Sequence, residues 1–282
     1  MNKYAFIIDV GKCENCNNCF LACKDEHCDN DWPGYSRPQP LHGHRWMNIL
    51  KKERGVFPLI DVAYLPKPCF HCDDAPCVSA GRGGLRKRED GIVIVDSAKA
   101  CGNRDLVSAC PHGALWWNEE EKMVQKCTFC AHLLDDGWQV PRCVQACPTG
   151  ALSIFRGSDE TLREKIVEQE LQPPPDSQNR GGSPRCFYRN LQRYTSCFLA
   201  GSVGVEQDGV EECGVGARVV LKKENEVVAE QLCDEFGDFR FDGLAPGSGE
   251  YLLEISYNGK VMKSGPIRLS ASRSAGTFVF SS

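Results

Sequence analysis

The spacing of its cysteines constrains the fold of this chain more than any other feature of the sequence. Fourteen of the 18 cysteines lie in residues 1–147, and twelve of these fourteen fall into four groups. In chain order the groups are Cys13, Cys16, Cys19 and Cys23; Cys69, Cys72 and Cys77; Cys110 alone; and Cys127, Cys130, Cys143 and Cys147. A chain of 282 residues buries enough core to be stable without disulfides, so this pattern indicates metal ligands rather than covalent staples.

The spacing is typical of loops that bind four-iron–four-sulfur cubanes. Three thiolates from one tight loop reach three corners of a cubane, and in two-cluster ferredoxins the fourth ligand comes from the run that binds the other cluster. Applied here, this exchange predicts three [4Fe–4S] clusters with twelve cysteine ligands. The predicted sets are Cys13, Cys16, Cys19 and Cys147 for cluster 1; Cys23, Cys127, Cys130 and Cys143 for cluster 2; and Cys69, Cys72, Cys77 and Cys110 for cluster 3.

A fourth cluster on the same plan lacks every ligand. Its expected cysteine positions hold Gly81, Ala100, Asn103 and Leu106. All four ligands of one site are missing together, and the other three sets are complete. This pattern indicates the loss of one whole site. Structural zinc is the alternative for the twelve cysteines, but zinc sites use pairs of cysteines rather than CxxCxxCxxxC runs.

The six remaining cysteines are expected to be buried thiols. They are Cys28, Cys101, Cys186, Cys197, Cys213 and Cys233. Because Cys101 is one residue from an expected ligand position, a remnant of the lost site is the alternative for it.

The sequence divides into three segments. Residues 1–156 carry the cysteine groups and short apolar runs, and they predict a duplicated, ferredoxin-like iron–sulfur domain. Residues 157–195 predict a helix that is capped by Ser158 and stopped before Pro173, followed by an irregular proline-rich linker.

Residues 196–282 alternate apolar and polar side chains, as in Phe239–Asp242 and Tyr251–Tyr257, and Asn258-Gly259 is a strong signal for a two-residue hairpin. Several such strands separated by glycine turns predict a β-sandwich that resembles transthyretin-like and Ig-like modules. The predicted fold class is therefore α+β: a duplicated ferredoxin-like [4Fe–4S] domain plus a C-terminal β-sandwich.

Composition bears on location and partners. The formal net charge of −5 gives no reason to expect nucleic-acid binding. The first ten residues are too short an apolar run for a secretory signal, and no stretch approaches the roughly 18 apolar residues of a membrane span. Since metal-binding thiols stay reduced in the cytoplasm, we expect a cytoplasmic protein without a membrane anchor.

The motifs resemble those of a known family. CENCNNCFLACKDEH at residues 13–27 and CFHCDDAPC at residues 69–77 resemble the iron–sulfur subunits of the dimethyl-sulfoxide-reductase family of molybdenum and tungsten enzymes. The stretches WPGY, GHRWMNI, REDGIVIVD, QKCTFCAHLLDD and EFGDFRFDGL resemble a branch of that family that transhydroxylates polyhydroxylated aromatics. This similarity covers nearly the whole chain, including the absent cluster and the sandwich.

The resemblance implies a heterodimer. A large catalytic subunit would bind a Mo or W bis-molybdopterin guanine dinucleotide and the phenolic substrate, while this chain would relay electrons and hold no catalytic residue. Small subunits of resorcinol hydroxylases and catechol dehydroxylases follow the same plan and stay open as alternatives. A mainly structural subunit also stays open, because transhydroxylation needs no net electrons and the clusters could brace the dimer.

Overall fold

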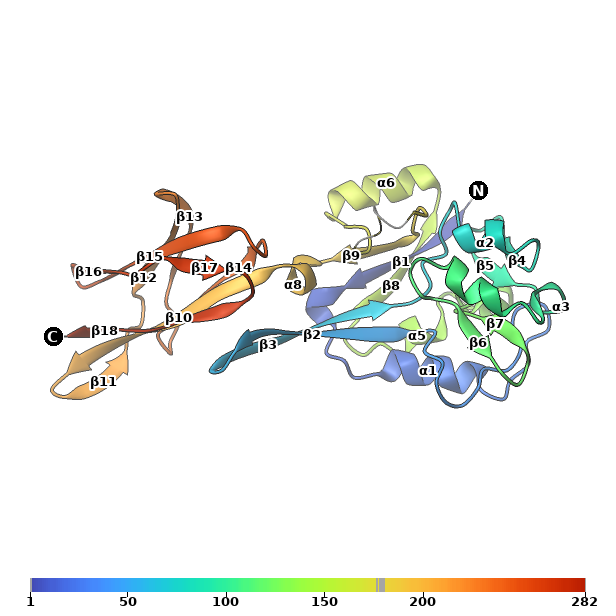
Figure 1. The fold of residues 1–282 in the computed structure, drawn as a ribbon, viewed down its shortest axis with the longest axis horizontal. Coiled ribbons are helices and arrows are strands. Elements are labelled where there is room, and N and C mark those ends of the chain that lie inside the picture. Colours follow the sequence, from blue (N-terminus) through green and yellow to red (C-terminus); the bar gives the residue numbers. More distant parts are fainter. Residues whose placement is uncertain (1, 176, 178–180, 282) are drawn as a thin grey trace. The chain divides into compact units, whose positions relative to one another are not determined.

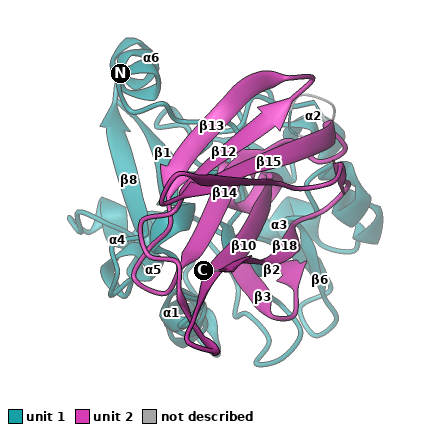
Figure 2. Ribbon diagram, turned by 90° about the vertical axis from the view of Figure 1, so that its left-hand side faces the viewer, with its two compact units in different colours: residues 1–50, 64–191 teal, residues 51–63, 192–282 magenta. Residues whose placement is uncertain are grey.

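The computed structural model describes residues 2–175, 177 and 181–281, and the described chain is mostly β-strand with few helices (Figure 1). It forms two compact units, coloured separately in Figure 2: Met1–Leu50 with Tyr64–Leu191, and Lys51–Ala63 with Gln192–Ser282. Most of the predicted linker, residues 157–195, belongs to the first unit. Residues 176 and 178–180 of that linker lie outside the described residues.

The first unit is organised around the strand β1 (Lys3–Asp9). β1 is the middle strand of a three-stranded sheet, antiparallel to β8 (Leu152–Gly157) and parallel to β9 (Cys186–Arg189). Its residues from Tyr4 to Ile8 are all buried, as expected for a strand covered on both faces. The sheet therefore joins the beginning and the end of the sequence of this unit.

Short helices surround this sheet. The helices α1 (Asn18–His27) and α5 (Arg142–Gln145) pack against each other. The hydroxyl of Ser158 accepts the N–H of Thr161 at 3.2 Å and caps α6 (Asp159–Glu168), as predicted. No helix in the described part of the chain combines the length and the apolar character that crossing a bilayer requires.

The first unit also contains several short elements. The helical turns are η1 (Val10–Lys12), α2 (Pro76–Ala80), α3 (Ser97–Ala100), η2 (Arg104–Ala109) and α4 (Ala131–Asp135). The strand pairs are β4 (Leu85–Lys87) with β5 (Val93–Val95), and β6 (Trp116–Asn118) with β7 (Met123–Gln125).

The second unit contains two sheets that share one core. One has β10 (Cys197–Gln207) pairing with β11 (Val210–Cys213), β14 (Asp238–Leu244) and, in parallel, β18 (Arg273–Ser281). The other contains β12 (Arg218–Lys223), β13 (Glu226–Leu232), β15 (Gly249–Tyr257), β16 (Lys260–Lys263) and β17 (Ile267–Leu269). The short helix α8 (Gln192–Thr195) precedes β10.

The sequence pattern of this unit agrees with its burial. Leu199, Phe239 and Leu253 come from different strands and lie in the same buried core. The predicted turn, Asn258-Gly259, connects β15 to β16, and both residues have the positive φ that such hairpin turns require. The apolar members of the alternating strands therefore face one another between the sheets.

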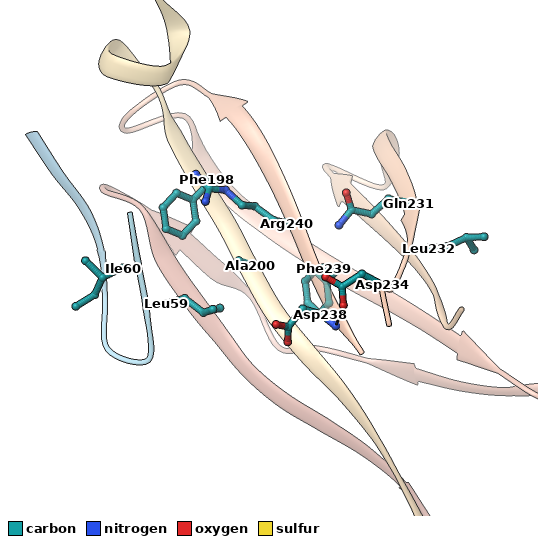
Figure 3. A pocket seen from close by; sticks show the side chains of 10 residues that line it. All are labelled: Leu59, Ile60, Phe198, Ala200, Gln231, Leu232, Asp234, Asp238, Phe239 and Arg240. Atoms are coloured by element: carbon teal, nitrogen blue, oxygen red, sulfur yellow. Dashed lines mark hydrogen bonds between the residues drawn. The ribbon is translucent and has the colours of Figure 1, made fainter. Parts of the chain in front are cut away.

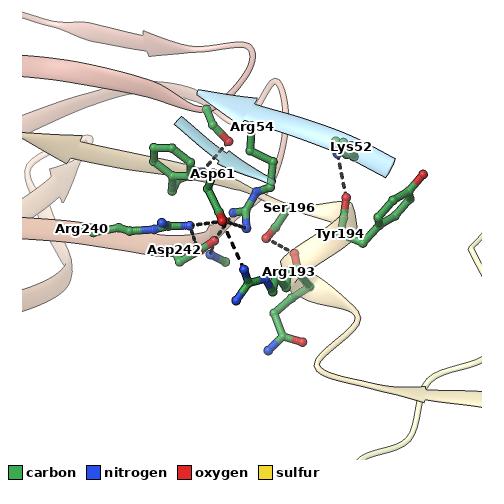
Figure 4. A network of polar contacts seen from close by, with 12 residues as sticks. Lys52, Arg54, Asp61, Arg193, Tyr194, Ser196, Arg240 and Asp242 are labelled. Atoms are coloured by element: carbon green, nitrogen blue, oxygen red, sulfur yellow. Dashed lines mark hydrogen bonds and ion pairs between the residues drawn. The ribbon is translucent and has the colours of Figure 1, made fainter. Parts of the chain in front are cut away.

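A hairpin formed by β2 (Asn48–Val56) and β3 (Leu59–Lys67) supplies residues 51–63 of the second unit. The side chain of Arg54 is fully buried and pairs with Asp61 at 3.3 Å and with Asp242 (Figure 4). Arg240 bonds the same two carboxylates at 2.8 and 2.7 Å.

The arginines control the charge of this network. Burial raises the pKa of the Asp61 carboxyl, but the hydrogen bond from Arg240 and the charges of the surrounding arginines outweigh burial, so the pKa lies below its usual value. The pKa of Asp242 is lowered against burial in the same way, chiefly by the hydrogen bond from Arg54. Ionised carboxylates therefore hold the hairpin in place.

Candidate iron–sulfur centres

Three CxxC turns of the first unit share one backbone conformation. The residue before the second cysteine has a positive φ in each: Asn15 at 56°, His71 at 47° and Phe129 at 59°. This left-handed conformation is uncommon for residues other than glycine, and such turns aim successive N–H groups at one point. In the third turn the N–H of Phe129 donates to the Cys127 Sγ atom at 3.4 Å. The turns thus present donors to sulfur, as iron–sulfur loops do.

The first set of thiols combines the first run with Cys147. Burial raises the pKa of the Cys19 thiol to about 12, and the nearby thiols of Cys13 and Cys147 add to this rise. Cys19 lies on α1 and Cys147 follows α5, so the packing of these two helices brings the thiols together. Cys16 is exposed and Cys13 and Cys147 are half-buried, which places this set at the surface of the first unit.

The second set is enclosed. Cys23, Cys127, Cys130 and Cys143 are each at most 8% exposed. Burial raises the pKa of Cys23 well above its usual value, and the thiols of Cys127 and Cys130 raise it further. The pKa of Cys143 also rises, first through burial and then through these same neighbours. Cys23 therefore lies with the last cysteine group rather than with its neighbours in sequence.

The third set joins Cys110 to the second group. Burial raises the pKa of the Cys72 thiol to about 12, and the thiols of Cys69, Cys110 and Cys77 contribute to the rise. The helix α2, which carries Cys77, contacts η2, which ends directly before Cys110. Contact between two short helical turns thus brings together thiols that are distant in sequence.

The second set adjoins both of the others. Cys143 of the second set is close enough to Cys19 of the first for the two thiols to interact electrostatically. Cys127 of the second set interacts in the same way with Cys69 of the third. The sets therefore follow one another in the order first, second, third.

Three of the four positions of the missing fourth set are tightly packed, whereas Asn103 is exposed. Ala100 is fully buried and Leu106 is 4% exposed. A Cβ atom at Gly81 would lie 2.9 Å from both the Cys77 carbonyl oxygen and the Leu85 Cδ1 atom. A larger side chain at Gly81 therefore could not be accommodated without movement of its neighbours.

The donor chemistry distinguishes cubanes from mononuclear zinc. All 18 cysteines are free thiols, and within the described residues no three Cys, His, Asp or Glu side chains converge on a single metal position. One zinc ion gathers four ligands at about 2.3 Å, whereas the thiolates around a cubane bind four different irons and stay farther apart. The three sets therefore fit cubanes better than zinc.

Polar groups surround the third set. Lys87 Nζ donates to the carbonyl oxygens of His71 at 3.1 Å and Cys72 at 2.6 Å. The His71 Nδ1 atom accepts the N–H of Val93 at 3.0 Å, so the ring carries its proton on Nε2. That buried Nε2 atom has no hydrogen-bond partner among the described residues. A donor left open beside a cysteine loop fits a cluster sulfur as its acceptor.

The linker segment also reaches the third set. A Cβ atom at Gly182, whose φ is 81°, would lie 3.2 Å from the Cys72 Sγ atom. The neighbouring Ser183 accepts the N–H of Asp73 at 2.8 Å. Sequence reasoning missed this contact. The local signal for it is the Gly181-Gly182 pair, because glycine permits close approach of a backbone.

The cysteines outside the three sets differ in burial. Four are buried or half-buried: Cys28, Cys186, Cys197 and Cys233. Cys101 and Cys213 are exposed, so the expectation of a buried thiol is wrong for both. Cys101 follows the end of α3, and Cys213 ends β11, an edge strand whose residues are all exposed.

A separate concavity of about 390 Å³ lies in the second unit (Figure 3). Its lining residues are Leu59, Ile60, Phe198, Ala200, Gln231, Leu232, Asp234, Asp238, Phe239 and Arg240. Its charged side chains already have partners: Asp234 accepts two backbone N–H groups, Asp238 accepts the hydroxyl of Ser202, and Arg240 belongs to the hairpin network. The concavity therefore has a mixed polar and apolar lining whose charged groups are already paired.

Comparison with known proteins agrees with these centres. The family model of the 4Fe-4S dicluster domain matches residues 60–156. The sequence is 44% identical to the pyrogallol hydroxytransferase small subunit of Pelobacter acidigallici over 264 residues, which cover 92% of this chain and 93% of that protein. It is 34% identical to the B subunit of the anaerobic dimethyl sulfoxide reductase of Escherichia coli (strain K12), covering 58% of this chain and 77% of that subunit.

A more distant relative is also named as an iron–sulfur subunit of a reductase. The arsenate respiratory reductase iron-sulfur subunit of Shewanella sp. is 27% identical, over 66% of this chain and 95% of that subunit. The protein belongs to the family of iron–sulfur electron-transfer subunits of the dimethyl-sulfoxide-reductase type, as a homologue of the pyrogallol hydroxytransferase small subunit.

Proposed function

We propose that this chain is the electron-transferring small subunit of a molybdenum or tungsten transhydroxylase for polyhydroxylated aromatics, of the pyrogallol–phloroglucinol type. The observation that carries the proposal is the 44% identity over 92% of the chain. The match includes the C-terminal part of the chain, whereas the E. coli reductase subunit matches only 58% of it.

The proposal gives the first unit three [4Fe–4S] clusters, one for each of the three thiol sets. It is supported by the grouping of four thiols in each set and by the close packing at Gly81, one of the positions of the missing set. Because the second set adjoins both of the others, an electron could pass from the first cluster to the second and from the second to the third. The chain would supply ligation, burial and hydrogen bonds that set potentials, and bond chemistry would take place in the partner.

The proposed partner is a large catalytic subunit that binds the Mo or W bis-molybdopterin guanine dinucleotide and the phenol. The surface position of the first set supports electron exchange with a bound protein there. We place the heterodimer in the cytoplasm, without a membrane anchor, because its thiols must stay reduced.

The second unit is proposed to be a transthyretin-like or Ig-like β-sandwich that braces the heterodimer. Two sheets with one common core support this assignment. Residues 196–282 supply the sandwich itself, residues 1–156 the iron–sulfur domain and residues 157–195 the helix and linker, and the β2–β3 hairpin adds residues 51–63 to the second unit.

Metal content and redox balance test the proposal. The heterodimer, purified without oxygen, should contain about 12 iron and 12 labile sulfide per small subunit, and about 16 iron would contradict three clusters. It should convert pyrogallol with a polyphenol co-substrate and no external electron acceptor. Strict dependence on an external electron acceptor would instead identify a hydroxylase, and strict dependence on an electron donor would identify a dehydroxylase. Full activity in a dimer that has lost a cluster would favour the bracing role.

A further inference from the structure

Lys126 is a buried cation between two of the thiol sets. The residue is 2% exposed and is among the largest fully buried side chains of the chain. It follows β7 and directly precedes Cys127, a member of the second set. Burying an ammonium group is costly unless an opposite charge compensates it, so the surroundings of Lys126 need a source of negative charge.

Among the residues that the structure describes, no carboxylate supplies that charge. Lys126 Nζ donates to the carbonyl oxygens of Val93 at 2.5 Å and Cys127 at 2.6 Å. Within the described part of the chain, no aspartate or glutamate forms an ion pair with it. Two carbonyl dipoles satisfy the hydrogen bonds of the ammonium but do not neutralise it.

The groups on which Lys126 acts electrostatically are cysteines of two different sets, which become negative thiolates when they bind a cluster. Burial raises the pKa of the Cys127 thiol to about 11, and the Lys126 ammonium opposes this rise. The same ammonium acts on Cys77 and Cys110 of the third set. Val93, which binds the ammonium through its carbonyl oxygen, also donates its N–H to His71 in the loop of the third set. The charge is thus held in place against both sets.

We propose that Lys126 is a positioning residue whose fixed charge serves as the shared counter-ion of the second and third clusters and stabilises their reduced forms. The inference rests on the proposed ligation of those clusters by the second and third sets. Reduction adds one electron, and hence one negative charge, to a cluster with its thiolates. A nearby fixed cation favours that added charge and so raises the potential.

The test compares Lys126→Gln, which removes the charge but keeps an N–H donor, with Lys126→Arg, which keeps the charge. The control is Lys122→Gln, because Lys122 has a side chain that is 64% exposed and pairs with Glu119 at 3.3 Å. Each variant is made in the complete heterodimer, its iron is counted, and its midpoint potentials are measured by a redox titration followed by electron paramagnetic resonance.

In Lys126→Gln we expect the equilibrium constants for reduction of the second and third clusters to fall at least tenfold, which is about 59 mV for a one-electron couple, while the potential of the first cluster stays unchanged. Lys126→Arg and Lys122→Gln should keep the wild-type potentials. Unchanged potentials in a fully loaded Lys126→Gln protein would overturn the proposal.

Loss of iron is also informative. Loss in Lys126→Gln but not in Lys126→Arg supports the need for the charge, whereas loss in both variants assigns Lys126 a packing role and overturns the proposal. If the wild-type protein itself contains fewer than about 12 iron or fewer than three reducible centres, the proposed ligation of three clusters is wrong. This outcome differs from the outcomes that refute the role of Lys126, so the two hypotheses are tested separately.

Discussion

Replacing Arg54 by methionine should loosen the β2–β3 hairpin from the rest of the second unit. The Arg54 side chain is fully buried, pairs with Asp61 and Asp242 and lies 5.3 Å from the centre of the Phe198 ring. Removing one partner of a buried ion pair costs about 3–5 kcal/mol when the other charge is left alone. Here Arg240 still bonds both carboxylates, and the Asp242 side chain is 38% exposed, so we expect a loss of about 2–3 kcal/mol.

Amide hydrogen exchange measured by mass spectrometry is the suitable assay, because it reports each segment separately. All five tryptophans precede residue 139 and lie in the first unit, so intrinsic tryptophan fluorescence would not report this change. A loss of 2–3 kcal/mol corresponds to roughly 30- to 150-fold faster exchange in peptides from residues 51–63. The matched control is Arg218→Met, since Arg218 pairs with Glu230 on the surface and should contribute little.

Acidity provides a second check. The pKa values of the Asp61 and Asp242 carboxyls lie below their usual value in the folded chain, because the arginines outweigh burial. Their stabilisation is therefore present above the unfolded pKa of about 3.9 and is lost as the pH falls through the folded pKa. The difference between the wild type and Arg54→Met should shrink below about pH 4. Equal exchange rates in Arg54→Met and Arg218→Met at pH 7 would refute the reasoning.

Three further predictions concern the centres. Cys147→Ser should change the resonance of the first cluster and Cys110→Ser that of the third; an effect of Cys147→Ser on the second cluster alone would contradict the exchange of ligands. Placing cysteine at all four positions of the missing set should not raise the iron content to about 16, because a side chain at Gly81 would collide with the Cys77 carbonyl oxygen; an iron content of about 16 would refute this reasoning. Gly182→Ala should shift the potential of the third cluster, because its Cβ atom would lie 3.2 Å from the Cys72 Sγ atom. Gly181→Ala, which has open space around its Cβ position, should leave that potential unchanged. Equal potentials in the two variants would show that the contact with Cys72 does not affect the third cluster.

The ligand sets are predicted from local spacing in the sequence. A CxxC turn has one geometry that suits a cubane, and the fourth ligand must come from another run, so the number of groups limits the pairings. The helix cap at Ser158 and the turn at Asn258-Gly259 are local for the same reason, and both are present. The assignment of ligands to clusters stays a prediction that the resonance experiment above tests.

Features that depend on distant contacts were not predictable. The β2–β3 hairpin joins the second unit because Arg54 meets Asp242, and no local pattern relates these two residues. The contact of Gly182 with Cys72 joins a linker to a loop more than a hundred residues earlier. The burial of Cys101 and Cys213 was wrongly predicted because residue type was used without knowledge of which strand or turn lies at an edge.

The central position of β1 has a consequence for biosynthesis. β1 is translated long before its partners, because Phe6 pairs with Ile154 and Cys186, which follow it by well over a hundred residues. At 5–20 residues per second, the wait for the later partner is roughly 10–40 s. During that time a nearly continuous apolar segment is unpaired and open to aggregation, so the nascent polypeptide is a natural client for chaperones. On the proposed ligation, insertion of a cluster into the first set must also follow translation of Cys147, which would make metal loading a late step in the maturation of this protein.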